Sequence, residues 1–486
     1  MTGQMENDGR TIKGTCFYIA IAGIFMLIIS YSWLSDGMFL DGTIYATLSR
    51  NLTMGLGTFW QPHLTNTLLP AFVEHPPLAL GLEGILFRIF GDSRFVERFY
   101  SLLTIIITGM IIVSIWKMLL KKSSTGWLPL LFWISMPTVT WASVNNMLEN
   151  TLIIFICLSV LFYIKSQKSN RIVFLSLAGL MLSSGFLTKG FVTFTPLALP
   201  FFSWLYSGNK KLSSMVSDTV IILISAVLPL IFLFLFTPAH EFFPRYIEIA
   251  FSKISTGVTA GSRFYILYRL VMELLPAFGI ILILMLYCWK NKLSFFNIGS
   301  SLSAASVFFS LGLAGVLPIL ATMDQSAYFL LLSFPFFAIS LGLTVNSSVE
   351  TLLERIDYNS NGYKLFKLFG VIALSAGIML SVYFSGDINR DKNMLNDMRV
   401  MLVQLEENST INILPEMYNE WSLHAYYGRY KNISLDPDLK NRHEYLLIRT
   451  SLYSDTINNR FEKIDLKTKE YELFRRKISG TRKSPQ

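Results

Sequence analysis

The chain has 486 residues, of which 52% are hydrophobic and only 15% are charged, and its mean hydropathy is +0.48. A soluble globular protein of this size needs more polar surface than this composition supplies, so a soluble fold is excluded. The formal net charge is +9. The basic residues gather in short loops and in the C-terminal segment, a pattern that indicates membrane topology and no nucleic-acid partner.

Long apolar runs recur along the chain, as the hydrocarbon core of a bilayer requires. The first, Cys16 to Leu34, is followed by no small-residue cleavage signature, so we interpret it as a retained span that also serves as signal anchor. The sequence predicts a polytopic α-helical membrane protein of about 11 transmembrane helices, the later runs lying at about 99–119, 127–143, 150–164, 172–188, 191–206, 217–236, 264–289, 298–320, 326–345 and 365–384.

Basic residues fall in alternate loops of this count, for example Lys210 with Lys211 and Lys290 with Lys292. Because lysine and arginine favour the cytoplasmic side, the N-terminus is predicted to be cytoplasmic. The first loop, residues 35–98, and everything after Ser385 are then expected outside the cytoplasm. We therefore expect a transmembrane domain over residues 1–384 and a small soluble extracytoplasmic α/β domain over residues 385–486.

The first loop holds an unusual share of the charged residues. Acidic side chains next to hydrocarbon are costly unless they are paired or used, so they are functional candidates. The apolar stripe from residue 40 to 52 predicts an amphipathic interfacial helix, and Leu78 to Phe90 predicts a second one, too short to span the membrane. The charged and titratable residues of the loop are Asp36, Asp41, Arg50, His63, Glu74, His75, Arg94, Glu97 and Arg98.

From Ser385 the composition is that of an ordinary soluble protein. A helical pattern over Lys392 to Glu407 precedes three short strand-like stretches, at Thr410–Leu414, Ile433–Leu435 and Tyr445–Arg449. These stretches are the basis for expecting the α/β domain.

Two acids stand at the outer ends of predicted spans, and each has two interpretations. Asp41 can be an N-cap of the helix that follows it, or a functional carboxylate. Glu149, at the start of the fourth span, can match the helix dipole or act chemically. The residues alone leave both alternatives open.

In combination, the motifs are more informative. The chain contains Asp41-x-x-x-Tyr45-Ala, Gly57-x-x-x-Gln-Pro, Glu74-His75-Pro-Pro-Leu, Phe90-Gly-x-Ser-x-Phe-x-x-Arg98, then Glu149, then Leu-Thr-Lys189-Gly. In this order the motifs resemble the C-type glycosyltransferases of the bacterial aminoarabinose transferase and protein O-mannosyltransferase-like family. The resemblance extends from Asp41 to about Pro335, and the stretch from Trp421 to Leu435 looks like the outer soluble domain of some members.

The resemblance implies transfer of a sugar from a polyprenyl-phosphate carrier on the outer face of the bacterial inner (plasma) membrane. It implies that Asp41 is the catalytic acid of the first loop and that Glu149 is the second acid. Tyr45, Glu74 and Arg98 fall in the matching motifs and are candidate site residues.

The chain departs from the family pattern at three positions of these motifs. Gly42 and Ile44 replace residues that are often Glu and Arg, and His75 replaces a lysine, which exchanges a permanent cation for a titrating one. The candidates to bind the donor phosphate are His75, Arg50, Lys189, Arg245, Lys253 and Arg263. No cofactor is required by the sequence, although Glu74 and His75 are weak candidates for a divalent metal site.

The predicted chemistry follows from the donor. A polyprenyl phosphate is a good leaving group, so one displacement needs a base on the acceptor hydroxyl and positive charge at the departing phosphate. With Asp41 as base, transfer to a lipid, glycan or protein acceptor inverts the anomeric centre. The alternative is a transporter or flippase of a lipid-linked glycan. The alternative is disfavoured because transporters place charges near the membrane midplane and contain repeats, whereas here the charges gather at one face.

Overall fold

The computed structural model describes residues 2–120, 124–208, 210–293 and 301–477. The chain divides into two units. The first comprises the residues up to Leu34 with Val73–Leu82 and Arg94–Ser385, and the second comprises Ser35–Phe72, Glu83–Ser93 and the residues from Gly386 on. The second unit therefore combines most of the first loop with the C-terminal segment. The division expected from the sequence, a transmembrane domain over residues 1–384 that includes the first loop and a separate domain over residues 385–486, remains a prediction.

The first unit is helical, and the described residues contain nine helical segments long and apolar enough to cross a membrane. The protein is thus a multi-pass membrane protein, while the expected count of about 11 spans is not confirmed. Five segments are single helices, namely α4 (Phe95–Leu119), α7 (Leu148–Ser166), α10 (Leu212–Phe236), α12 (Tyr265–Lys290) and α14 (Phe334–Glu354). A sixth, Gly14–Trp33, is the apolar part of α1 (Thr2–Trp33). The other three run through more than one element: Arg171–Tyr206 through α8 (Arg171–Lys189), η1 (Gly190–Ala198) and α9 (Leu199–Ser207); Leu302–Ala321 through α13 (Ser301–Val316) and η2 (Leu317–Ala321); and Asn361–Gly386 through α15 (Asn361–Tyr383) and η4 (Phe384–Gly386).

Two features account for the difference in count. The expected span at 127–143 is divided into two seven-residue helices, α5 (Leu128–Ile134) and α6 (Pro137–Ser143), and Pro137 begins the second. The expected spans at 172–188 and 191–206 form one continuous segment through the 3-10 stretch η1. Two further elements are not candidate spans, namely α11 (Ala239–Thr256) and η3 (Ala327–Leu332).

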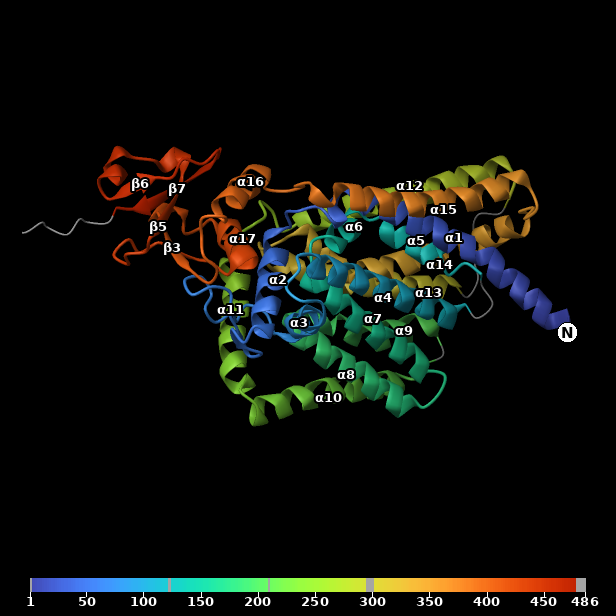
Figure 1. Ribbon diagram of the computed structural model, residues 1–486. Coiled ribbons are helices and arrows are strands. Elements are labelled where there is room, and N and C mark those ends of the chain that lie inside the picture. The colour runs from blue at the N-terminus through green and yellow to red at the C-terminus, as the bar shows by residue number, and fades with distance from the viewer. Residues whose placement is uncertain (1, 121–123, 209, 294–300, 478–486) are drawn as a thin grey trace, which may run out of the picture. The chain divides into compact units, whose positions relative to one another are not determined.

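Small residues let the first and last long helices pack closely. Helices α1 and α15 lie side by side (Figure 1), and a Cβ atom added at Gly23 would come within 2.9 Å of the Ala373 Cβ atom. At Gly377 an added Cβ atom would come within 2.8 Å of Met26. Close backbone approach at small residues is a general means of associating helices in membranes.

The second unit contains α2 (Leu40–Thr53), the short hairpin of β1 (Gly57–Thr58) and β2 (Gln61–Pro62), and the C-terminal half of α3 (Leu78–Phe90). The two helices form over the ranges that the apolar patterns predicted. Its C-terminal part holds α16 (Lys392–Met401), η5 (Pro415–Met417), α17 (Trp421–Lys431), η6 (Thr450–Leu452), η7 (Asp455–Asn459) and the strands β3 (Thr410–Ile413), β4 (Ser434–Asp436), β5 (Tyr445–Arg449), β6 (Phe461–Lys463) and β7 (Tyr471–Arg476).

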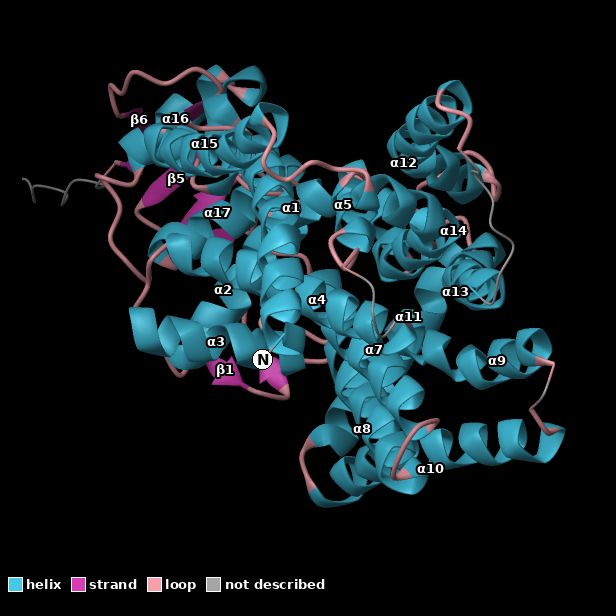
Figure 2. Ribbon diagram, turned by 90° about the vertical axis from the view of Figure 1, so that its right-hand side faces the viewer, coloured by secondary structure: helices cyan, strands magenta, loops and turns pink. Residues whose placement is uncertain are grey.

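These five strands form one mixed sheet in the order β4-β3-β5-β7-β6. Strand β3 pairs in parallel with β4 and β5, and β7 pairs antiparallel with β5 and β6. Helices α16 and α17 bury Leu395, Met398 and Leu423 in one core with Ile411 and Leu435 of the sheet. Figure 2 shows these strands in magenta beside α16 and α17. The helix expected over 392–407 ends earlier, at Met401.

The buried His424 of α17 makes this unit sensitive to acid. Its side chain is 0% exposed, and its ring packs edge-on against Tyr418 at a centroid distance of 5.7 Å. Burial lowers the pKa of His424 from 6.5 to about 4. The unfolded state therefore gains a proton near pH 6.5 while the folded state does not, so stability decreases as pH falls from 6.5 toward 4.

We expect the free energy of opening α17 to fall by about 2 to 3 kcal/mol between pH 7.5 and 4.5. Hydrogen exchange of residues 421–431 measures this change. His424→Phe removes the titrating group from an apolar site and should make the exchange less dependent on pH. Equal pH dependence in His424→Phe and in the wild type would exclude His424 as the cause.

Candidate functional site

Asp41 lies in the first turn of α2 and does not cap it. The helix begins at Leu40, the N-cap position is Phe39, and that residue makes no side-chain capping bond. The N-cap interpretation of Asp41 is therefore wrong, because the capping position falls two residues earlier in the chain. A carboxylate in the first turn still interacts favourably with the helix dipole. The Asp41 side chain is partly exposed, whereas the residues that follow it in the helix are buried.

A buried ion pair joins the ends of two helices of the first unit, α7 and α8. Glu149 lies in the first turn of α7, Lys189 is the last residue of α8, and the Lys189 ammonium donates to Oε1 of Glu149. Glu149 is 1% exposed, and its second oxygen, Oε2, receives no hydrogen bond from any described residue. A buried carboxylate with an unsatisfied oxygen is costly unless it is used, which marks this pair as a functional candidate.

Aromatic residues complete the surroundings of Lys189. Its Nζ atom lies 5.5 Å from the ring centre of Tyr328 and 5.8 Å from that of Phe329, within the range of cation–π interactions. The next residue, Gly190, has a φ of +76°, and a Cβ atom there would overlap the Tyr246 hydroxyl at 1.6 Å. Glycine is therefore needed for Tyr246 to pack against the end of α8 that carries Lys189.

A second cation lies in the same unit. Nζ of Lys253, on α11, is 3.0 Å from Oε2 of Glu74, in a partly exposed ion pair. The next residue, His75, interacts electrostatically with both Lys189 and Lys253. The structure thus brings together five residues that the sequence analysis selected one by one, namely Glu74, His75, Glu149, Lys189 and Lys253. We call them the phosphate-site cluster.

His75 is a neutral member of this cluster. Desolvation of the ring lowers the pKa of His75 well below 6.5, and the ammonium groups of Lys189 and Lys253 lower it further. Because the pKa is depressed, the ring carries no charge at neutral pH and can donate only a neutral hydrogen bond. The positive charges of the cluster are therefore those of the two lysines.

This charge state predicts a pH profile. The ratio of the dissociation constants of a polyprenyl phosphate for His75→Gln and for the wild type should stay constant between pH 6.5 and 8, because His75 is expected to remain neutral there. Forming the ratio cancels the second ionisation of the phosphate itself. Restoring a permanent cation with His75→Lys should tighten binding about tenfold at low salt. A ratio that rises about tenfold toward pH 6.5 would show that His75 becomes a cation in this range.

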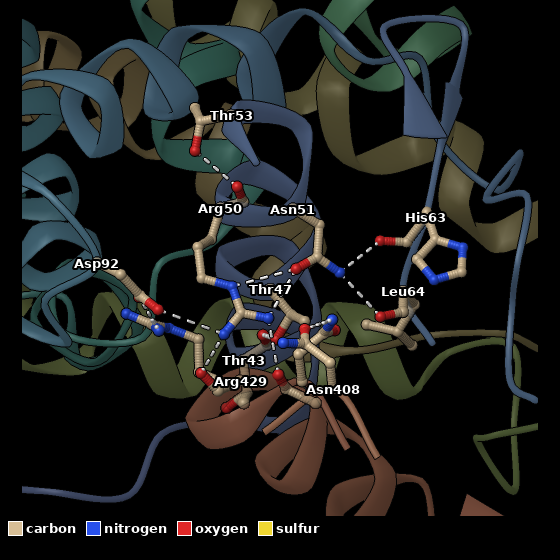
Figure 3. Close-up of polar contacts among 12 residues, drawn as sticks. Thr43, Thr47, Arg50, Asn51, Thr53, His63, Leu64, Asp92, Asn408 and Arg429 are labelled. Carbon is tan, nitrogen blue, oxygen red and sulfur yellow. Dashed lines mark hydrogen bonds and ion pairs between the residues drawn. The ribbon is translucent and has the colours of Figure 1, made fainter. Parts of the chain in front are cut away.

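Arg50 has surroundings unlike those expected of a phosphate ligand. It is 2% exposed and lies in the last turn of α2. Its guanidinium donates to the carbonyl oxygens of Gly428 at 2.8 Å and Arg429 at 2.7 Å, and to Oδ1 of Asn51. Oδ2 of Asp92 lies 3.5 Å from the Arg50 guanidinium, and Oδ1 of Asp92 accepts from the Arg429 guanidinium at 2.6 Å. Figure 3 shows the guanidinium of Arg50 pointing toward these groups.

The remaining candidates are distributed differently. Arg245 and Arg263 are exposed in the first unit, and no described contact joins their side chains to the phosphate-site cluster. Arg98 is buried near the start of α4 and donates to the carbonyl oxygen of Val144. Tyr45 is buried within α2. Among the described residues, no group of three or more His, Cys, Asp or Glu side chains could hold a metal ion.

The sequence analysis missed the aromatic residues Tyr246, Tyr328 and Phe329. Each lies in an apolar or amphipathic stretch rich in Phe and Leu, where nothing local distinguishes it from a packing residue. The conspicuous feature near Tyr246 was Gly190, because a glycine directly after the last basic residue of a helix indicates a close approach or a left-handed turn.

Comparison with solved structures identifies the fold of the whole chain as that of a known integral-membrane protein. The structure of ArnT from Cupriavidus metallidurans in the apo state matches with a TM-score of 0.63, over 94% of this chain and 96% of that one, at 13% identity. The structure of the same protein bound to undecaprenyl phosphate matches with a TM-score of 0.61, over 95% and 98%, at 14% identity.

Comparison of the amino-acid sequence also finds sugar transferases of membranes among the similar proteins. The family model of dolichyl-phosphate-mannose-protein mannosyltransferases matches residues 74–236. The undecaprenyl phosphate-α-4-amino-4-deoxy-L-arabinose arabinosyl transferase of Pectobacterium carotovorum is 24% identical over 205 residues, which are 41% of this chain and 35% of that protein. The match thus spans about a third of the length of this relative. These findings confirm the resemblance to the aminoarabinose transferase and protein O-mannosyltransferase-like glycosyltransferases.

Proposed function

We propose that this protein is an inverting glycosyltransferase of the bacterial inner membrane, which moves a sugar from a polyprenyl-phosphate donor to a lipid, glycan or protein acceptor. The observation that carries the proposal is the phosphate-site cluster, in which Lys189 and Lys253 supply positive charge and His75 a neutral donor. Each ammonium group is paired with a carboxylate, Lys189 with Glu149 and Lys253 with Glu74.

The proposed chemistry is a single displacement. Asp41 takes the proton of the acceptor hydroxyl, whose oxygen attacks the anomeric carbon as the bond to the polyprenyl phosphate breaks. The departing phosphate takes the bonding electrons, and Lys189 and Lys253 stabilise its charge. Glu149 holds the Lys189 ammonium in place before the donor binds, through the buried ion pair.

The orientation follows from the basic loops. We propose about 11 spans, with the N-terminus cytoplasmic, and that the first loop and the soluble α/β domain of residues 385–486 are extracytoplasmic. The aminoarabinose relatives act with undecaprenyl phosphate, as their names state. We therefore propose cell-envelope glycosylation, of lipopolysaccharide or of protein, as the process served.

The proposal is tested with the purified full chain and a panel of undecaprenyl-phosphate sugars. Release of undecaprenyl phosphate is measured together with the mass of the glycosylated product. Mass spectrometry of lipid-linked sugars and envelope glycans, with and without the intact gene, identifies the sugar and acceptor. Movement of the intact donor between the leaflets of vesicles, without release of undecaprenyl phosphate, would establish the transporter alternative instead.

A further inference from the structure

Helix α17, near the C-terminus, contacts the chain on both sides of Asp41. On the N-terminal side, the buried hydroxyl of Tyr426 accepts from the backbone N–H of Met38 at 3.1 Å. The same hydroxyl lies 2.9 Å from the Met38 carbonyl oxygen and 2.9 Å from Oδ2 of Asp391, either of which can accept its proton. Tyr426 therefore fixes the backbone three residues before Asp41.

A further contact precedes the helix. Asp36 is buried, with Oδ2 at 2.6 Å from the guanidinium of Arg399 and with Oδ1 accepting from the hydroxyl of Tyr430 on α17. Its backbone also pairs with the C-terminal segment. The backbone N–H of Asp36 donates to the carbonyl oxygen of Asp387 at 2.7 Å, and the backbone N–H of Asn389 donates to the carbonyl oxygen of Asp36 at 2.9 Å. The entry to α2 is thus held by side chains and by backbone bonds from residues beyond 385.

On the C-terminal side, Arg50 of α2 reaches the last turn of α17. Its bonds go to the carbonyl oxygens of Arg429 and of Gly428, and the Gly428 oxygen also accepts from the backbone N–H of Asn432 at 3.0 Å. The two helices are also in contact beside these bonds, since a Cβ atom added at Gly428 would lie 3.5 Å from the Thr47 methyl group. Contacts on both sides of Asp41 leave α2 little freedom to shift along α17.

We propose that α17 positions α2, and with it Asp41, so that Tyr426 and Arg50 are positioning residues for sugar transfer. This inference rests on the proposed role of Asp41 as base. A general base must lie within hydrogen-bond reach of the proton it takes, and a displacement of about 1 Å can lower the rate about a hundredfold. The C-terminal segment is therefore part of the catalytic apparatus without contributing a group to the chemistry.

The inference assigns Arg50 a role that differs measurably from phosphate binding. A phosphate ligand acts on the affinity for the donor, and lysine can replace arginine as a point charge. A positioning residue with two directed bonds acts on kcat, and lysine cannot reproduce the fork of the guanidinium. Arg50→Lys and Arg50→Gln should therefore both lower kcat, and both should bind undecaprenyl phosphate within about threefold of the wild type.

The decisive variant is Tyr426→Phe, with Tyr427→Phe as its matched control. Tyr427 is the adjacent residue of the same helix, is similarly buried, and its hydroxyl donates to the Met401 sulfur within the C-terminal core. We expect Tyr426→Phe to lower kcat at least about tenfold, with undecaprenyl phosphate affinity within about threefold of the wild type. Tyr427→Phe should stay within about twofold in both.

Hydrogen exchange provides a readout that does not depend on activity. Residues 40–53 should exchange faster in Tyr426→Phe than in Tyr427→Phe, because only the first loses its contact with Met38. Equal hydrogen exchange and equal kcat in Tyr426→Phe and Tyr427→Phe would overturn the inference. A tenfold loss of affinity for undecaprenyl phosphate in Arg50→Gln, with normal affinity in Arg50→Lys, would also overturn it. If the wild type transfers no sugar, the proposed function fails, whereas the exchange experiment still decides whether α17 holds α2.

Discussion

Asp41→Asn should lower the rate of sugar transfer at least about a hundredfold, the usual lower bound for the loss of a general base. Asparagine keeps the size of aspartate but cannot take a proton at neutral pH. Its effect on folding should be small, because Asp41 lies in the first turn of α2 and contributes about 0.3 to 1 kcal/mol through the helix dipole. The measurements are single-turnover transfer from purified donor lipid and the thermal midpoint of the same sample.

The affinity for undecaprenyl phosphate separates chemistry from binding in this experiment. If Asp41 acts as base, Asp41→Asn binds undecaprenyl phosphate at least as tightly as the wild type, since it removes a negative charge. Asp41→Glu is the companion variant, because it keeps the basic group and changes only its reach, so it should retain more activity than Asp41→Asn. Full transfer by Asp41→Asn would refute the assignment, and Asp36 and Glu149 would be tested next.

Lys189→Met should have the second largest effect, and it should act on stability and on binding together. It leaves the Glu149 carboxylate buried without its partner, which costs about 3 to 5 kcal/mol when a buried pair is broken. The double variant Glu149→Gln/Lys189→Met removes both charges and should recover most of the stability. It should not recover affinity for undecaprenyl phosphate, because the cation that faces the phosphate is still absent.

A second pair of the first unit serves as control. The buried carboxylate of Asp218 forms an ion pair with the Arg171 guanidinium, with Oδ1 of Asp218 at 2.6 Å from the Arg171 nitrogen. Arg171→Met should lower the thermal midpoint, although less than Lys189→Met because Arg171 is itself 43% exposed. It should leave the binding of undecaprenyl phosphate unchanged. Recovery of phosphate affinity in the Glu149→Gln/Lys189→Met double variant would show that Lys189 has only a structural role.

Local patterns predicted the local structure well. The apolar spacing over residues 40–52 and 78–90 gave α2 and α3, and strand β5 has the predicted bounds Tyr445–Arg449. The 3-10 stretch η1 and the division into α5 and α6 were not predicted, because hydropathy measures the length of an apolar run and not its helical continuity. The resemblance found from ordered motifs was confirmed by the comparisons.

The site was predictable where topology brings helix ends together. Helices α7 and α8 have 19 residues each and are joined by a short loop, so the first turn of α7 with Glu149 returns beside the last turn of α8 with Lys189. The partners of Arg50 lie 378 and 379 residues further along the chain, and no local pattern indicates them. The charge state of His75 was likewise hidden, since it depends on desolvation and on lysines from two distant helices.

The two-part construction of the second unit has a consequence for biosynthesis. The segment up to Ser93 leaves the ribosome first, and its remaining partners begin at Gly386, a gap of 386 − 93 = 293 residues. At roughly 5 to 20 residues per second, the first loop waits about 15 to 60 seconds before its C-terminal partners begin to be translated, and α17 follows later still. During this interval Arg50 lacks its carbonyl acceptors, and α2 lacks the helix that holds it. Nascent chains released before α17 would therefore carry Asp41 without an ordered α2, so that only chains translated through this helix would transfer sugar.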